Sequence, residues 1–285
     1  MLKLGIITDQ VSMDFEKALK AIKEYGLEYI DIHALWGKNI EELTNDEITA
    51  AKKLISKYGL KVSNIGSTCF LQCHLRDNNE IKIKSFSDHF ITIFGDYKQH
   101  LDYFQHCIKL CEIFKADTLR IFGFRKLEPF TDNTINLVTE KFIEPVAIAK
   151  KAGITLVLEN CPWTYLPSGA LVSKVINKIN SIHLRALWDP GNAYHSGVEP
   201  YPDDYLHVKD LLGHIHMKDF KCLNKKDTVI IGEGDINYQG LLSSLVKSNF
   251  QDVLSLEPEY KDKIMGSIES CRRCVVEVRD ILKRI

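Results

Sequence analysis

The sequence predicts an α/β protein that folds as a (β/α)8 TIM barrel, and three observations support this prediction. Eight short apolar runs, rich in β-branched residues, alternate with helices or with segments long enough to form one. The runs follow one another at intervals of roughly 25–55 residues, which is the scale of βαβ units. The length of 285 residues suits one such barrel. We therefore expect a single domain over residues 1–285.

The first half of the chain supplies four of the eight expected strands, at residues 2–7, 29–33, 60–65 and 118–122. Asp14 is a suitable N-cap for a helix over residues 15–25, whose apolar residues recur at helical spacing. Gly26 is expected to end that helix. Thr44 or Asn45 is expected to cap a helix that runs to Tyr58, and a further helix is predicted over residues 97–114.

The second half continues the alternation with strands at residues 154–158, 184–188, 213–217 and 253–256. Helices are predicted over residues 133–151 and 265–282. The strands are apolar on both faces, as in parallel sheets covered by helices. An open doubly wound sheet uses the same alternation, but the count of eight favours the closed barrel. No GxGxxG motif follows the first strand, so no nucleotide cofactor is expected.

Composition excludes several classes of protein. Lys+Arg number 37 and Asp+Glu 38, a net charge of −1, so no basic excess indicates a nucleic-acid partner. No run approaches the roughly 18 apolar residues of a membrane span, and no signal pattern opens the chain. We expect a cytoplasmic protein without a membrane partner. The sequence is compatible with a homo-oligomer but does not decide the oligomeric state.

The eight cysteines are expected to be reduced and mostly buried. Cys107 with Cys111, and Cys271 with Cys274, stand at helical spacing inside amphipathic segments. The alternative is a zinc site at Cys271 and Cys274, but neither a second CxxC nor a pair of histidines accompanies them.

Two connections are longer than a plain barrel needs, at residues 67–100 and 219–236. Both follow the carboxyl end of a strand, where the active sites of such barrels lie. We predict that they are lids or binding walls. The alternative is that the two connections are insertions without a function.

Polar residues end four consecutive strands of the second half. Glu159, Asp189, His216 and Glu257 occur there at separations of 30, 27 and 41 residues, each one βα unit. Carboxylates at the mouth of an apolar barrel are costly to bury unpaired and would raise one another's pKa. A divalent cation removes that cost, and carboxylates with one imidazole suit Mn²⁺, Mg²⁺, Co²⁺ or Zn²⁺. The alternative is that each of these four residues forms an ordinary salt bridge at the end of its strand.

The seventh strand carries two histidines with period two, so both point the same way. His216 is nearer the carboxyl end and is the better ligand, whereas His214 is expected to lie deeper as a hydrogen-bonded interior residue. Lys218 follows on the same face. It could hold a substrate oxygen or phosphate, or it could be a solvated lysine at a strand end.

Other residues near the predicted mouth are candidates for substrate binding. Arg120 lies within an apolar run and therefore needs a buried partner, which could be a substrate anion, Asp31 or Glu159. Asn160 and Asn192 are candidates to orient the metal ligands. The remaining candidates either end the second strand or are aromatic residues that could wall a pocket or simply pack: Asp31, His33, Trp36, Phe70, Trp163 and Tyr165.

Five motifs resemble the sugar phosphate isomerase/epimerase family, which has the xylose-isomerase-like TIM barrel. They are VLEN (157–160), WDPGN (188–192), HIHMKD (214–219), GEGDI (232–236) and SLE (255–257). The resemblance implies a divalent metal bound by Glu159, Asp189, His216 and Glu257. It also implies that the two glutamates act as acid and base on a carbohydrate-like small molecule.

This chain differs from two branches of the xylose-isomerase-like superfamily at residues that those branches need for their reactions. The DNA-repair endonucleases have a histidine where this chain has Asn192. They also have an Asp-x-His pair where this chain has the apolar residues 229–231. Both differences argue against a three-metal phosphodiesterase. The ketose 3-epimerases have an arginine where this chain has Cys222, which argues against free-ketose 3-epimerisation.

The resemblance and the metal site together predict an isomerase or epimerase that works through a metal-stabilised enediolate. Glu257 is the expected base and Glu159 its partner. The rival hypotheses are a metal-dependent dehydratase or lyase of a keto-polyol or keto acid, and a non-enzymatic sugar-sensing barrel. The sequence does not identify the substrate.

Overall fold

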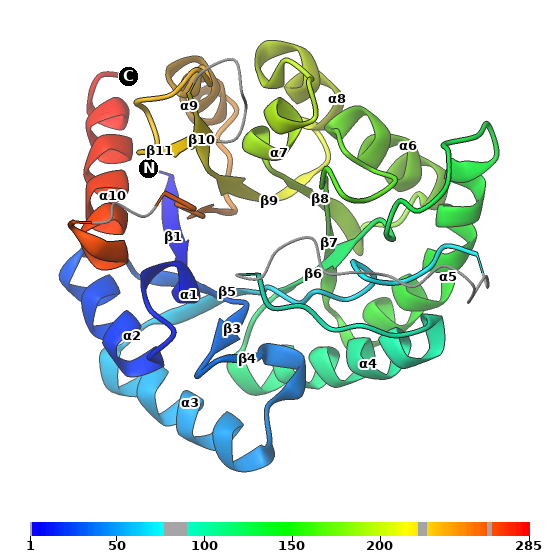
Figure 1. Cartoon of the computed structure of the whole chain (residues 1–285), viewed down its shortest axis with the longest axis horizontal. Coiled ribbons are helices and arrows are strands. Elements are labelled where there is room, and N and C mark those ends of the chain that lie inside the picture. Colours follow the sequence, from blue (N-terminus) through cyan, green and yellow to red (C-terminus); the bar gives the residue numbers. More distant parts are fainter. Residues whose placement is uncertain (1, 77–89, 222–226, 261–263) are drawn as a thin grey trace.

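The main feature of the computed structural model is a closed barrel of eight parallel strands, shown in Figure 1. The structure describes residues 2–76, 90–221, 227–260 and 264–285. Around the barrel the strand order is β1-β12-β9-β8-β7-β6-β5-β2, which confirms the predicted (β/α)8 fold. The barrel strands are β1 (Lys3–Ile7), β2 (Tyr29–Ile32), β5 (Lys61–Ile65), β6 (Thr118–Phe122), β7 (Thr155–Glu159), β8 (Leu184–Trp188), β9 (Leu212–Met217) and β12 (Val253–Leu256).

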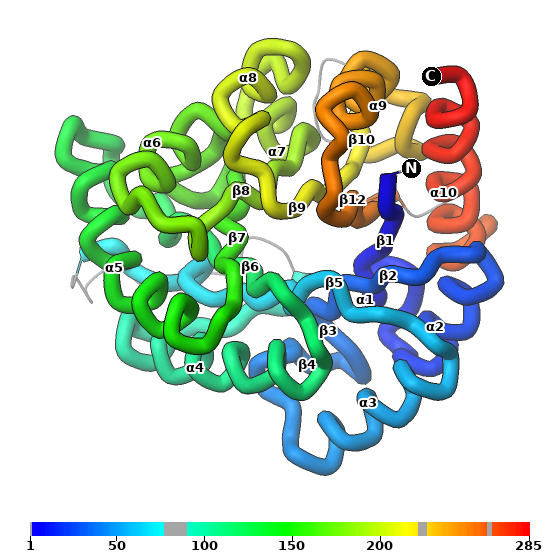
Figure 2. Tube along the Cα trace, turned by 180° about the vertical axis from the view of Figure 1, so that it is seen from behind, coloured from blue at the N-terminus to red at the C-terminus, as the bar shows by residue number. Residues whose placement is uncertain are grey.

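Helices form a ring outside the barrel, and the view from behind shows the same ring (Figure 2). The longer helices are α2 (Phe15–Glu24), α3 (Asn45–Tyr58), α4 (Tyr97–Phe114), α5 (Thr134–Ala152), α6 (Gly169–Ile179), α9 (Tyr238–Lys247) and α10 (Gly266–Lys283). Shorter helical segments are α1 (Thr8–Val11), η1 (Ile40–Glu42), α7 (Pro190–His195), η2 (Pro200–Asp204) and α8 (Tyr205–Val208). Two small hairpins follow β2 and β9: β3 (Ala34–Leu35) with β4 (Lys38–Asn39), and β10 (Asp219–Phe220) with β11 (Thr228–Val229).

Local signals in the sequence set the helix boundaries. The Asp14 side chain accepts a hydrogen bond from the Lys17 backbone N–H at 3.1 Å and begins α2, as predicted. Of the two residues considered for the cap of α3, Thr44 is the N-cap, and it forms a reciprocal capping box with Glu47. Gly59 ends α3 with φ of 62°, a left-handed conformation that glycine adopts without strain.

Aromatic rings fill part of the core between the barrel and the helices. The Phe70 ring packs against Phe124 and Phe142, at centroid distances of 5.5 and 5.6 Å, and is fully buried. Tyr165 is also buried, and its hydroxyl accepts a hydrogen bond from the Glu128 backbone N–H. The hypothesis that Phe70 and Tyr165 wall the pocket is therefore wrong, because both side chains pack into the core.

Replacing Phe142 by Ala should lower the free energy of unfolding by about 3–5 kcal/mol, because it leaves a cavity beside two buried rings. Urea denaturation measures this change. Ile143→Ala is the matched control: it lies next to Phe142 on α5, its side chain is 61% exposed, and its loss should have little effect. Equal losses for the two variants would contradict this description of the core.

The long connections lie at the carboxyl-terminal rim. In the connection after β5, the Ile91 carbonyl lies 3.0 Å from His33 Nε2, just beyond β2; residues 77–89 of this connection are outside the described residues. In the connection after β9, the buried Asp219 carboxylate accepts hydrogen bonds from the backbone N–H groups of Gly232 and Gly234. A Cβ at Gly234 would collide with that carboxylate, so the close approach requires glycine there.

The seven described cysteines are buried thiols, as expected, and Cys222 lies outside the described residues. Two groups of described side chains are close enough to share a cation, and neither contains a cysteine. Within the described ranges, no helix combines the length and apolarity that a bilayer span requires.

Candidate active site

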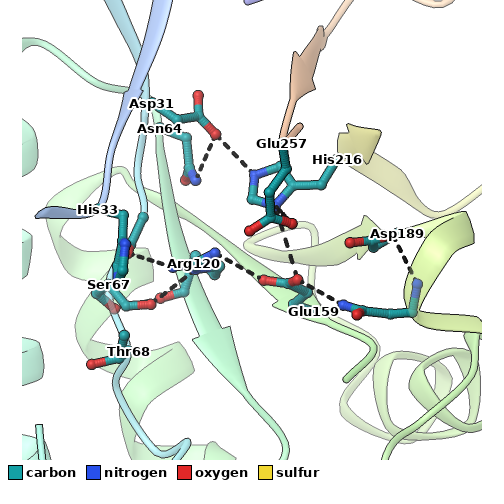
Figure 3. A network of polar contacts seen from close by, with 12 residues as sticks. Asp31, His33, Asn64, Ser67, Thr68, Arg120, Glu159, Asp189, His216 and Glu257 are labelled. Carbon is teal, nitrogen blue, oxygen red and sulfur yellow. Dashed lines mark hydrogen bonds and ion pairs between the residues drawn. The ribbon is translucent and has the colours of Figure 1, made fainter. Parts of the chain in front are cut away.

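Three of the four predicted ligands form one buried cluster at the carboxyl ends of β7, β9 and β12. The ligand atoms of Glu159, His216 and Glu257 all lie within 4.8 Å of one another. His216 Nδ1 is 3.7 Å from Glu257 Oε2 and 3.9 Å from Glu159 Oε1. The parallel pairing of β9 with β12 sets Ser255 beside His216 and so brings Glu257 to the same rim. Figure 3 shows the imidazole between Asp31 and the two glutamates.

Asp189, the fourth predicted ligand, lies beside this cluster. It follows β8 and caps α7, because its Oδ1 accepts a hydrogen bond from the Asn192 backbone N–H at 2.9 Å. The Asn160 side chain holds the Asp189 backbone in place through two hydrogen bonds, of 2.8 and 2.9 Å. Asp189 Oδ2 lies 3.1 Å from Lys218 Nζ but forms no hydrogen bond within the described part of the chain.

Lys218 joins Asp189 to the cluster. Its Nζ is 3.0 Å from Glu257 Oε2 and 2.9 Å from Glu259 Oε1, and the residue is buried. The alternative of a solvated lysine is therefore wrong, because three carboxylates surround the ammonium group. Gly191 makes room for this side chain, since a Cβ at that position would collide with Lys218. No local signal in the sequence predicts this contact of Glu259.

Arg120 has a buried protein partner. Its Nη1 donates to Glu159 Oε2 at 3.1 Å, and its other nitrogens donate to the backbone carbonyls of Gly66 and Ser67. Asn192 Nδ2 donates to the other oxygen of Glu159 at 3.1 Å. Of the partners considered for Arg120, Glu159 is the one observed. Arg120 and Asn192 together fix the orientation of the Glu159 carboxylate.

Burial and mutual repulsion give the three carboxyl groups different pKa values. Burial raises the pKa of Glu159, and the charge of Glu257 adds to the effect although Arg120 opposes it. Burial likewise raises the pKa of Asp189, with Lys218 opposing. Burial also disfavours ionised Glu257, but the positive charges of Lys218 and Arg120, with the hydrogen bond from Lys218, outweigh burial and lower its pKa. A further positive charge would relieve the remaining cost of ionising Glu159 and Asp189.

The residues of this cluster fit a divalent cation. His216 Nδ1 and Asp189 Oδ2 are buried atoms without a hydrogen-bond partner among the described residues. Ligands bound to one ion at about 2.1 Å lie about 3–4 Å apart, and the observed separations from His216 Nδ1 are 3.7 and 3.9 Å. Carboxylate oxygens with one imidazole nitrogen suit Mn²⁺, Mg²⁺, Co²⁺ or Zn²⁺.

The other candidate residues of the predicted mouth differ in how much of their surface is exposed. His33 is buried, its Nδ1 lies 3.1 Å from Asp9 Oδ2, and its ring stacks on Phe90. Trp36 and Trp163, by contrast, keep 36% and 41% of their surface exposed. The two tryptophans therefore keep surface that solvent reaches, whereas both nitrogens of His33 already face protein oxygens.

A second polar cluster lies deeper in the barrel. His214 is the buried interior histidine that the strand periodicity predicts, and its Nε2 lies 2.9 Å from Asp31 Oδ2. Asp31 also contacts His216. The sequence shows that Asp31 ends a strand, but it does not show that β2 faces β9 across the barrel interior.

Replacing Arg120 by Met is expected to lower the free energy of unfolding of the metal-free protein by about 3–5 kcal/mol, because Glu159 would stay buried without its cation. Urea denaturation measures the loss. The double variant Arg120→Met/Glu159→Gln should recover part of it. Lys57→Met, which breaks an exposed pair with Glu16, should change stability little. No recovery in the double variant would contradict the buried pairing.

The closed barrel of eight parallel strands, with a polar cluster at their carboxyl ends, defines this chain as a TIM-barrel protein. The family model of xylose isomerase-like TIM barrels matches residues 19–274. The chain therefore belongs to the xylose isomerase-like TIM barrel family, as its motifs indicate. A comparison with curated proteins gives no match.

Several solved structures share the fold at low sequence identity. The IOLI protein with a bound zinc atom has a TM-score of 0.74 at 16% identity, over 99% of each chain. The 3-keto-D-glucoside 4-epimerase YcjR from E. coli has a TM-score of 0.72 at 16% identity, over 98% of this chain and 100% of its own. AsbF from Bacillus anthracis, assigned as a 3-DHS dehydratase, has a TM-score of 0.73 at 14% identity, over 100% of both chains.

Proposed function

We propose that this protein is a divalent-metal-dependent isomerase or epimerase of a sugar, a sugar phosphate or a related hydroxy-keto compound. The observation that carries the proposal is the buried cluster of Glu159, His216 and Glu257, with Asp189 beside it. Those four residues would hold the cation. The epimerase YcjR and the zinc-bound IOLI protein, which share the fold, support this choice of reaction and cofactor.

The bound cation would supply Lewis acidity that polarises a substrate carbonyl and stabilises an enediolate. Glu257 is the proposed base for the proton next to that carbonyl, and Glu159 is its partner. Each glutamate is held by one cationic side chain, Lys218 for Glu257 and Arg120 for Glu159. Return of the proton to the opposite face epimerises the substrate, and its return to the neighbouring carbon isomerises it.

Six residues are proposed to form the substrate side of the site. Trp36 and Trp163 have the exposed surface to contact a sugar ring and exclude water. Lys218 has its ammonium group beside Glu257, where it can donate to a substrate oxygen. The other three residues are proposed to orient their neighbours. Arg120 and Asn192 donate hydrogen bonds to Glu159, and His33 contacts the Ile91 carbonyl at the rim.

A dehydratase or lyase is the second candidate, because AsbF shares the fold over the whole length of both chains. Both reactions begin by removing the proton next to a carbonyl, and they differ in whether a β-hydroxyl group then leaves.

A screen of aldoses, ketoses, their phosphates and keto-polyols in D₂O, with and without added Mn²⁺, Co²⁺, Mg²⁺ or Zn²⁺, separates these activities. An isomerase or epimerase exchanges a carbon-bound proton for deuterium and its product keeps all the oxygen atoms of the substrate. A dehydratase releases water. Metal-dependent deuterium incorporation into a sugar-like compound is the expected result. Binding of sugars without any turnover would instead favour a sugar-sensing barrel.

A further inference from the structure

We infer that Asp31 is a positioning residue for His216: it accepts the Nε2–H of the imidazole and so turns the unprotonated Nδ1 toward Glu159 and Glu257. The inference rests on the proposed function, because it concerns how this chain prepares one ligand of the cation.

The contact between the two side chains is direct and buried. His216 Nε2 lies 3.0 Å from Asp31 Oδ2, and the side chains are 0% and 1% exposed. A carboxylate has no hydrogen to donate, so the proton of this hydrogen bond lies on Nε2. In the neutral ring, Nδ1 then carries a lone pair. Nδ1 has no hydrogen-bond partner in the ranges that the structure describes, and it faces the two glutamates.

Other donors fix the Asp31 carboxylate in place. Ser255 Oγ donates to its Oδ1 at 2.9 Å, and Asn64 Nδ2 lies 3.3 Å from its Oδ2. His214 Nε2 approaches Oδ2 at 2.9 Å, and Ser63 also donates to Oδ1. These partners come from β5, β9 and β12, so three strands of the barrel hold the acceptor that orients His216. Figure 3 shows Asp31 with Asn64 on one side of the imidazole and Glu159 and Glu257 on the other.

Asp31, His214 and His216 also form a group whose ligand atoms are close enough to share a cation. Their N···O separations of 2.9 and 3.0 Å are those of N–H···O hydrogen bonds. Hydroxyl and amide groups donate hydrogen bonds to both carboxylate oxygens of Asp31, so these oxygens have partners without a metal. The structure therefore favours a hydrogen-bonded support beneath one metal centre over a second metal site.

Partners that orient a metal-bound histidine usually contribute 10- to 100-fold in metal affinity. Asp31→Ala is therefore expected to weaken the binding of Mn²⁺ or Zn²⁺ by about that factor in isothermal titration calorimetry. Asp31→Asn keeps one acceptor oxygen and should restore part of the affinity. Asp204→Ala is the matched control, because Asp204 is equally buried, accepts hydrogen bonds from Trp188 and Gly169, and contacts none of the proposed ligands. It should lower the melting temperature but not the metal affinity.

A second readout is independent of activity and of the folding of any Asp31 variant. The ¹H–¹⁵N spectrum of histidine-labelled wild-type protein, with the signals of His216 assigned by their loss in His216→Gln, reports which ring nitrogen carries the proton. We expect the proton on Nε2 in both the zinc-loaded and the metal-free protein. A ring with Nε2 unprotonated would overturn the inference, as would wild-type metal affinity in Asp31→Ala. Wild-type protein that binds no metal would overturn the proposed function itself, so the two failures are distinguishable.

Discussion

Glu257→Gln is expected to lower turnover by about 10²–10⁴-fold while the fold is retained. The substitution keeps the size of the side chain but removes the group proposed to take the proton. Lys218 keeps Asp189 and Glu259 as partners, so its charge stays compensated. Solvent deuterium incorporation into the substrate found by the screen measures the loss, and the melting temperature checks the fold.

Glu259→Gln is the matched control for this prediction. Glu259 shares the Lys218 ammonium with Glu257, but its side chain is 40% exposed and it is not among the proposed ligands. Its substitution should change turnover only slightly. Near-native exchange in Glu257→Gln would remove Glu257 from the proposed chemistry, and equal losses in both variants would point to Lys218 as the group affected.

Removal of the proposed cation is the second change with a large expected effect. A chelator should abolish deuterium incorporation, because the buried carboxylates would lose the cation that compensates their charge. Re-addition of one divalent ion should restore activity. The same ion should raise the melting temperature, since a ligand at 100 times its Kd stabilises the folded state by about 2.7 kcal/mol.

The comparison should be made on one preparation, with metal content measured before and after chelation. Magnesium, manganese, cobalt and zinc are added separately, so that the most effective ion is identified. Full activity in protein shown to be free of metal would contradict the proposed mechanism.

The sequence was sufficient to predict the fold because its signals are local and repeated. Strands β6 and β8 have their predicted ends, and Asp14 and Gly59 mark helix boundaries as capping chemistry requires. Eight strand–helix units leave few arrangements other than a closed barrel. Periodicity does not show which way a side chain points in the loop after a strand, so the sequence left open whether Phe70 and Tyr165 line the pocket or pack in the core.

The candidate site was predictable only in part. The positions of Glu159, His216 and Glu257 at strand ends follow from the register of a parallel barrel, so their proximity could be expected. The burial of Lys218 could not be expected, because it depends on carboxylates from distant strands that surround it together. The contact of Asp31 with His216 likewise depends on which strands face one another across the closed barrel.

We propose that one divalent cation is bound by Glu159, Asp189, His216 and Glu257. Anomalous diffraction from crystals of the manganese-loaded protein tests it most directly. We expect one peak within bonding distance of these four side chains, on the Nδ1 side of His216. The absence of a peak there, or a peak between Asp31 and His214, would contradict it.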